Sequence, residues 1–188
     1  MFKIRVVLSF VAIGILVMSS PAAAHSSVVQ DPTGDTADTT PPYYDIVKAK
    51  IHRTGDESGA HRAIVFSMKL AVPIPQLASS TFFAANWLLD TNSARVGPEY
   101  NVIVRWCTTA THPRCKAGDA HWEGAVNDFA NGTQTYVSMI DIDGDAVTLW
   151  LDPERIGSPD QFDWQGATRS RGAQPIPEDD TEVASFDR

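Results

Sequence analysis

The sequence predicts an all-β protein, an antiparallel β-sandwich of the jelly-roll kind with about eight or more strands. Two observations lead to this prediction. Apolar and polar residues alternate along several short segments, which is the pattern of strands with one buried face. Turn residues, mainly Gly, Asp, Asn and Pro, separate these segments about every ten residues. No segment shows the apolar period of an amphipathic helix.

The strands are predicted in chain order from this alternation. Residues 45–53 and 62–70 form a hairpin around the Gly- and Asp-containing turn at 54–60. Residues 81–90 are apolar on both faces, as in a central strand that is covered on both sides. A helix is the alternative for this segment, because Ala, Leu and Trp tolerate either structure. The remaining strands are predicted at residues 99–106, 121–129, 135–142, 145–151 and 162–169.

The first 24 residues have the parts of a secretory signal peptide. Lys3 and Arg5 supply the positive charge, Val6–Met18 the apolar segment, and Ala22–Ala24 the small residues before the cleavage point. The apolar segment is shorter than the roughly 20 residues of a membrane-spanning helix. We therefore expect residues 1–24 to be removed on export. A secreted or extracytoplasmic protein with no membrane span would remain.

The charge of the chain restricts its partners. The formal net charge of −8 becomes −10 when Lys3 and Arg5 are removed. Nucleic acids bind basic surfaces, so an acidic protein is not expected to bind them, whereas divalent cations suit it. The length after cleavage suits one domain. We expect a polar lead-in at 25–42, the β-sandwich at 43–170, and an acidic, irregular C-terminal segment at 171–188.

The two cysteines, Cys107 and Cys115, are predicted to form a disulfide. An even number of cysteines in an exported protein favours this pairing, which here closes a short local loop. His112 and His121 lie nearby at a spacing that could also hold zinc. The oxidising environment outside the cytosol favours the disulfide over the zinc site.

Several short motifs occur in a recognisable order: Asp31–Asp35, Tyr44–Ile46, Trp87–Asn92, Gly97–Tyr100 and Ile156–Pro159. Together they resemble exported bacterial β-sandwich domains of the DOMON and family 9 carbohydrate-binding-module kind. The resemblance covers most of residues 31–169. It implies a sandwich that binds a sugar, haem or another ligand, and a structural calcium near the opening motif. The segment Asp180–Ala184 lacks the proline of the family's acidic closing motif, so the resemblance gives no basis for calcium ligands at that end.

Asp31, Asp35 and Asp45 are the predicted metal ligands, and calcium is the expected cofactor. Calcium takes six to eight oxygen ligands, which clustered Asp side chains and turn carbonyls supply. Asp38 belongs to the same acidic cluster. The alternative is that these residues only form turns and cap a strand, because Asp-Pro and Gly-Asp are common turn pairs. A second acidic run, Asp141–Asp145, favours a hairpin turn at its Asp-Gly pair.

Function is predicted as that of a non-catalytic binding module. The sequence contains none of the common nucleophile, metalloprotease or phosphate-loop motifs, so no enzyme is expected. Trp106 and Trp122 flank the cysteine loop and are the predicted ligand-binding residues, although core packing is the alternative for each ring. The expected partner is a carbohydrate or an envelope protein. The alternatives are an envelope structural or interaction protein without a small-molecule ligand, and a secreted hydrolase or a haem or redox protein.

Overall fold

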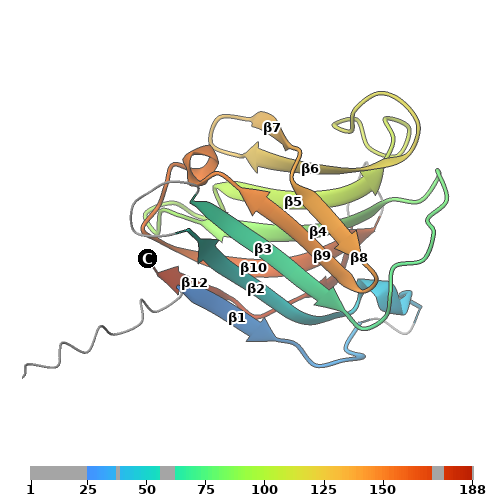
Figure 1. Ribbon diagram of the computed structural model, residues 1–188, viewed down its shortest axis with the longest axis horizontal. Helices are drawn as coiled ribbons and strands as arrows, with labels where there is room; N and C mark the ends of the chain where they lie inside the picture. Colours follow the sequence, from blue (N-terminus) through green and yellow to red (C-terminus); the bar gives the residue numbers. More distant parts are fainter. Residues whose placement is uncertain (1–24, 37–38, 56–61, 171–175, 188) are drawn as a thin grey trace, which may run out of the picture.

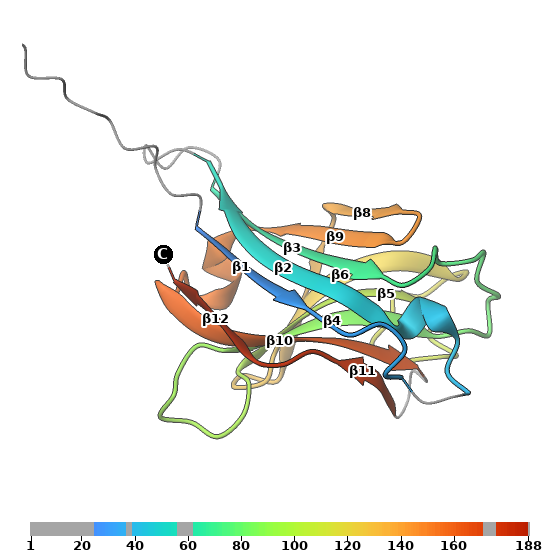
Figure 2. The ribbon, with the colours of Figure 1, turned by 90° about the horizontal axis from the view of Figure 1, so that it is seen from below.

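The computed structural model describes residues 25–36, 39–55, 62–170 and 176–187. Their strands form two antiparallel sheets that pack face to face, which confirms the predicted all-β sandwich (Figures 1 and 2). The predicted signal peptide lies outside the described residues. Within the described residues, no helix has the length and apolar character needed to cross a membrane.

The first sheet has five strands. Its order is β1 (Ser26–Gln30), β2 (Ile46–Thr54), β3 (Ala63–Leu70), β9 (Ala146–Leu151) and β8 (Ile140–Asp143). β2 and β3 form the predicted hairpin. β8 and β9 form a second hairpin, whose turn holds Gly144 at a φ of 59°. This left-handed conformation explains why an Asp-Gly pair occurs there, since glycine adopts it without steric cost.

The second sheet is built around β4 and β10. Its order is β7 (Thr133–Val137), β6 (His121–Asp128), β5 (Tyr100–Cys107), β4 (Phe83–Asp90) and β10 (Gln161–Ser170), followed by β11 (Ile176–Asp180) and β12 (Ala184–Asp187), which both pair with the free edge of β10. β4 is a central strand with most of its residues buried, as its apolar sequence predicts.

The core lies between the sheets and is formed by the inward-facing residues of both. Its fully buried large apolar side chains include Ile51, Phe66, Met68, Phe83, Trp87, Leu89 and Trp164. The rings of Phe66 and Trp87 join the two sheets, with centroids 5.8 Å apart. Burying one such side chain stabilises a fold by about 1.5–3 kcal/mol, so this layer fixes how the sheets face each other.

The sheets extend beyond the predicted boundaries of the sandwich. β1 and a short 3-10 helix, η1 (Pro42–Tyr44), lie near the ends of the segment predicted as a polar lead-in. The C-terminal segment, predicted as irregular, contributes β11 and β12. The single strand predicted at 135–142 is two strands, β7 and β8, in different sheets. All of these segments are at or near sheet edges, and β1, β7 and β8 bury few side chains, so their sequences alternate only weakly.

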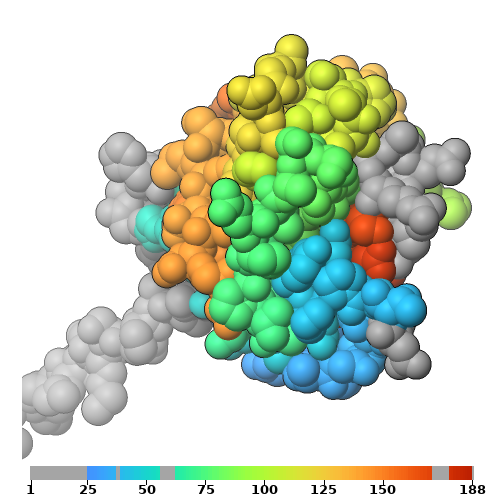
Figure 3. Space-filling model, turned by 90° about the vertical axis from the view of Figure 1, so that its right-hand side faces the viewer, coloured from blue at the N-terminus to red at the C-terminus, as the bar shows by residue number. Residues whose placement is uncertain are grey.

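The loop between β3 and β4 covers one end of the sandwich. Figure 3 looks at this end, where the loop (green) runs across the centre of the view. Ile74 and Leu77 pack against the core. The indole N–H of Trp106 donates to the carbonyl oxygen of Ala78 at 3.0 Å. Along another edge of the molecule, β1 lies beside β12 (Figures 1 and 2).

Candidate functional site

The outer face of the seven-stranded sheet presents polar side chains in the middle of strands. Strand alternation sends Val102 and Val104 of β5 into the core, so Asn101 and Arg105 point to the opposite face. Asn86 does the same on β4. The register places Asn101 directly opposite Asn127 of β6. The strand register therefore gathers these polar residues on the outer face of the sheet.

The loop between β5 and β6 forms one wall over this face. The predicted disulfide between Cys107 and Cys115 is present and closes the loop, with Cα atoms 6.2 Å apart. The carbonyl oxygen of Arg114 accepts hydrogen bonds from Arg105 Nη2 at 2.6 Å, Gln134 Nε2 at 3.0 Å and the Tyr136 hydroxyl at 3.1 Å. The disulfide and these bonds fix the loop against β5 and β7.

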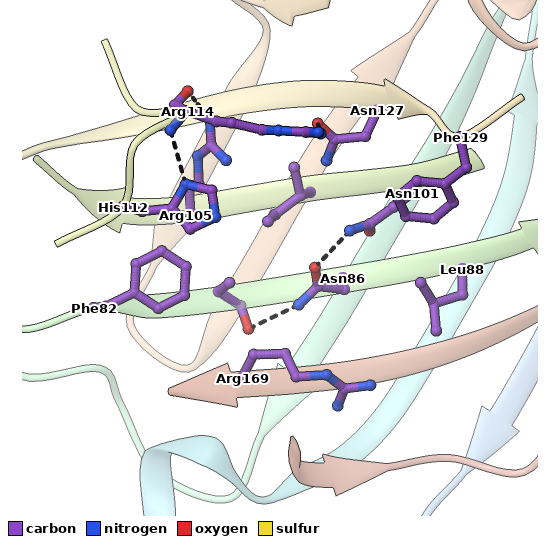
Figure 4. Close-up of a pocket in the computed structure, with 12 residues that line it drawn as sticks. Phe82, Asn86, Leu88, Asn101, Arg105, His112, Arg114, Asn127, Phe129 and Arg169 are labelled. Atoms are coloured by element: carbon purple, nitrogen blue, oxygen red, sulfur yellow. Dashed lines mark hydrogen bonds between the residues drawn. The ribbon is translucent and has the colours of Figure 1, made fainter. Parts of the chain in front are cut away.

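Sheet and loop together enclose a groove of about 360 Å³ (Figure 4). We call it the outer groove, and its lining includes Phe82, Asn86, Asn101, Arg105, His112, Arg114, Asn127, Phe129 and Arg169. Aromatic rings lie at both ends. Phe82 stacks on His112 at one end, with centroids 5.6 Å apart, and Phe129 is half exposed at the other. The volume is at the lower end of the range for small-molecule sites, about 300–1,000 Å³.

Three asparagines form a polar row along the floor of the outer groove. Asn101 Nδ2 donates to Asn86 Oδ1 at 3.1 Å, and Asn86 Nδ2 donates to the Ala84 carbonyl oxygen at 3.3 Å (Figure 4). Asn127 Oδ1 accepts from Arg114 Nη1 at 3.5 Å. Asn101 Oδ1 is buried and has no hydrogen-bond partner among the described residues. A buried acceptor without a partner is unfavourable, so this atom suits a donor supplied by a ligand.

Three arginines also line the outer groove, and they differ in their partners. Arg105 is buried and bonds to the buried carboxylate of Glu123, with Nε 2.6 Å from Oε1. Arg169 forms an ion pair with Asp180 at 2.7 Å. Arg114 is exposed and pairs with no carboxylate in the described part of the chain. No Asp or Glu is among the described lining residues, although the whole chain is acidic.

His112 reports the electrostatics of the outer groove. Burial against Phe82, the larger cause, and the nearby charges of Arg105 and Arg114 together lower the pKa of its imidazole to about 4. The carboxylate of Glu123 opposes them. The imidazole is therefore neutral at pH 7, and the net field at this end of the groove disfavours an added positive charge.

A second site is an acidic cluster where the N-terminal and C-terminal segments meet. Asp31, Asp35 and Asp179 each place a carboxylate oxygen within 4.8 Å of the other two. Asp31 follows β1, Asp35 lies in the next turn, and Asp179 belongs to β11. Asp45 is buried beside them, and its Oδ2 accepts from the backbone N–H of Gly34 at 2.7 Å.

The acidic cluster holds several carboxylates close together where solvent has limited access. Burial, followed by the charges of Asp179, Asp35, Asp45 and Glu182, raises the pKa of Asp31 to about 7. Burial and the charges of Asp35 and Asp45 raise the pKa of Asp179 to about 6 against the effect of two backbone hydrogen bonds. Asp31 Oδ2 and Asp45 Oδ1 are buried without a partner among the described residues. An all-oxygen set with such atoms fits a hard divalent cation such as Ca²⁺.

Of the three predicted metal ligands, the structure places two in the possible metal site and the third beside it. It brings Asp31 and Asp35 together, whereas Asp45 lies next to them and fastens the turn between them. Asp38 lies outside the described residues. Asp179 was missed, because the segment after 170 was expected to be irregular. The acidic run that ends β11 was the available signal, but only its pairing with β10 reveals where Asp179 lies.

Trp106 and Trp122, the predicted ligand-binding residues, lie on the other side of the sheet from the outer groove. They face each other on β5 and β6, with ring centroids 5.8 Å apart in an edge-on arrangement. Trp122 also contacts Phe83 at 5.7 Å. Both are half-buried at the margin of the core. Their role in ligand binding stays a prediction, and the outer groove is a separate candidate that the sequence did not indicate.

In comparisons with known proteins, no family model, no curated protein and no solved structure matches this chain. The resemblance to DOMON and family 9 carbohydrate-binding domains accordingly stays a prediction. The choice of ligand depends on the chemistry of the outer groove and the acidic cluster.

Proposed function

We propose that this protein is an exported, non-catalytic binding module that takes a carbohydrate in its outer groove. The observation that carries the proposal is the row of three asparagines between aromatic rings. A sugar presents hydroxyl groups that both donate and accept hydrogen bonds, and an amide side chain offers both a donor and an acceptor. The exposed ring of Phe129, at one end of the groove, supplies apolar contact for the C–H face of a sugar ring.

The floor and the wall of the outer groove are both held rigidly by the fold, as a preformed binding site requires. Its floor consists of neighbouring strands of a hydrogen-bonded sheet, whose opposite face is the core. Its wall is fixed by the disulfide and by the three bonds to the Arg114 carbonyl. Side chains on strands are held more accurately than side chains on free loops. The site is therefore formed before the ligand arrives, which limits the entropy lost on binding.

Calcium is proposed as a stabilising ion at the acidic cluster. Asp31, Asp35 and Asp179 would hold it, with Asp45 as a buried neighbour whose charge acts on both Asp31 and Asp179. A bound cation would supply the positive charge that these carboxylates lack. It would also link the segment after β1 to β11, which are far apart in the sequence and adjacent in the fold.

The test is a binding measurement by calorimetry, with neutral and acidic oligosaccharides, on variants of each face of the sheet. Asn101→Leu removes the central amide of the groove but preserves the size of the side chain. Trp106→Phe keeps a ring on the opposite face and is the matched control. We expect Asn101→Leu to weaken binding at least tenfold, as loss of one or two buried hydrogen bonds predicts, and Trp106→Phe to have little effect.

The reverse pattern would place the ligand at the tryptophan pair, and the outer groove would then not be the site. Binding of none of the oligosaccharides by the wild-type protein would contradict carbohydrate binding as a whole. Circular dichroism and melting curves of both variants establish that they are folded before they are compared.

A further inference from the structure

We infer that the outer groove selects acidic sugars, with an anionic substituent of the ligand, a carboxylate or a sulfate ester, held by Arg114. This inference rests on the proposed function, because it names the class of carbohydrate that the same groove takes. It follows from the charges that line the groove and from the way in which Arg114 is presented.

The charge balance of the groove is opposite to that of the whole chain. The chain carries a formal net charge of −8, yet the described lining holds three arginines and no acid. Glu123 compensates Arg105, and both are buried. Asp180 compensates Arg169 on the other side of the groove. Arg114 alone contributes a cation without a carboxylate partner among the described residues, so it is available to an anionic group.

Arg114 is held in place mainly through its backbone, and within the described part of the chain its guanidinium makes only a long hydrogen bond to Asn127 Oδ1, at 3.5 Å. Its carbonyl oxygen accepts three hydrogen bonds from β5 and β7, and its N–H donates to His112 Nδ1 at 3.1 Å. The guanidinium lies along the groove toward Asn127, as Figure 4 shows. A guanidinium presents two parallel N–H groups that match the two oxygens of a carboxylate. A sugar acid can therefore bond to Arg114 while its hydroxyls contact the asparagines.

His112 supplies a supporting observation from inside the groove. Burial is the main cause of its low pKa, and the charges of Arg105 and Arg114 lower it further. A neutral sugar leaves those charges in place. An anionic group beside Arg114 counteracts them, so the pKa of His112 should rise when an acidic ligand binds. At saturating ligand, the imidazole is thus a reporter of ligand charge.

The experiment compares one oligosaccharide with and without its charge. The probes are a galacturonate trimer, its fully methyl-esterified form, and a sulfated galactan fragment, measured by calorimetry at low and high salt. We expect the acidic forms to bind at least tenfold more tightly than the ester, and salt to weaken only the acidic forms. Arg114→Gln should remove this preference. Arg155→Gln, at an exposed position of the 3-10 helix η2 (Pro153–Ile156), is the matched control and should keep it.

The outcomes separate this inference from the proposed function. Equal binding of the acid and its ester, or an unchanged preference in Arg114→Gln, overturns the inference and leaves a neutral carbohydrate as the ligand. Absence of binding by every probe contradicts both. Tighter binding of the sulfated probe or of the uronate identifies which anionic group is recognised. An NMR titration of His112 adds an independent result: its pKa should rise with the uronate trimer and stay near 4 with the ester.

Discussion

At the scale of single residues, His112 is a neutral imidazole held between an aromatic ring and two arginines. Phe82 stacks on one face of the ring. The charges of Arg105 and Arg114 lower the pKa of the imidazole, and the charge of Glu123 raises it. We predict that the imidazole in the ligand-free protein titrates near pH 4, and that Arg114→Gln raises this pKa, since one of the nearby cations is removed. NMR of the ring protons measures both values. An unchanged pKa in the variant would show that Arg114 does not act on the groove.

The pKa values of Asp31 and Asp179 are raised, whereas that of His112 is lowered, and they predict how stability depends on pH. Their pKa values in the folded protein are about 7 and about 6, above the ordinary value of 3.8. Between pH 3.8 and the raised pKa values, the folded state holds protons that the unfolded state has lost. The free energy of unfolding therefore falls as pH rises through this range. In chelator, we therefore expect the contribution of these groups to be complete below about pH 4 and lost by pH 7.

Urea unfolding of the chelated protein at several pH values measures this dependence. Asp31→Asn is the control, because an amide does not titrate, and it should flatten the curve between pH 4 and 7. Added calcium should also flatten it, since the cation favours the ionised carboxylates. A wild-type curve that rises with pH over the same range, and is unaffected by Asp31→Asn, would contradict the charge crowding at this cluster.

At the scale of elements, the chain changes sheets between β7 and β8, and Gly124 of β6 is the tightest point beneath that crossing. A Cβ at Gly124 would lie 2.7 Å from Ile140 Cγ2 and 2.9 Å from the Val137 carbonyl oxygen. Because one of these atoms is a backbone oxygen, a change of side-chain rotamer cannot relieve the clash. We predict that Gly124→Ala destabilises the fold by about 1–3 kcal/mol, the usual effect of overpacking.

Chemical unfolding measures this effect. Gly132→Ala is not a suitable control because that glycine has a positive φ. Ala130→Ser, at an exposed turn position, should be close to neutral. A Gly124→Ala variant as stable as wild type would mean that β6 and β8 do not pack as closely as described.

The elements that the sequence predicts best are those with local signals. The β2–β3 and β8–β9 hairpins follow from alternation and turn residues, and the disulfide follows from the even number of cysteines together with the expected export. The sequence does not predict β11, because this strand has no clear alternation of its own and is formed by its pairing with β10. The groove was missed for a related reason. Asn86, Asn101 and Asn127 lie on three strands, and only the register brings them into one row.

At the scale of the whole molecule, β11 connects the two candidate sites. Asp179 belongs to the acidic cluster, and its Oδ2 accepts from the backbone N–H of Ile46 at 2.6 Å. The next residue, Asp180, pairs with Arg169 at the outer groove. A cation at the cluster would therefore stabilise the junction of β2 and β11 and the position of a groove arginine. No single segment of the sequence shows this connection, because its parts come from both ends of the chain.

We predict that calcium raises the melting temperature and that chelator lowers it, because an ion that binds only the folded state stabilises that state. Asp35→Asn is the better variant for this test, since Asp35 is exposed and its loss should not disturb the fold. It should reduce the calcium-dependent shift and slightly raise the melting temperature in chelator, because it removes one of the charges that crowd Asp31 and Asp179. Asp141→Asn, at an exposed position of β8, is the control. Equal melting temperatures with calcium and chelator would exclude the acidic cluster as a calcium site.

The central claim is that the outer groove binds the ligand, and mapping the contact by NMR tests it most directly. A galacturonate trimer is titrated into isotope-labelled protein, and shifts of backbone and side-chain N–H groups are followed. We predict that the shifts concentrate at the three groove asparagines and on the loop from Cys107 to Cys115. Shifts concentrated at Trp106 and Trp122, with the groove asparagines unchanged, would contradict the claim.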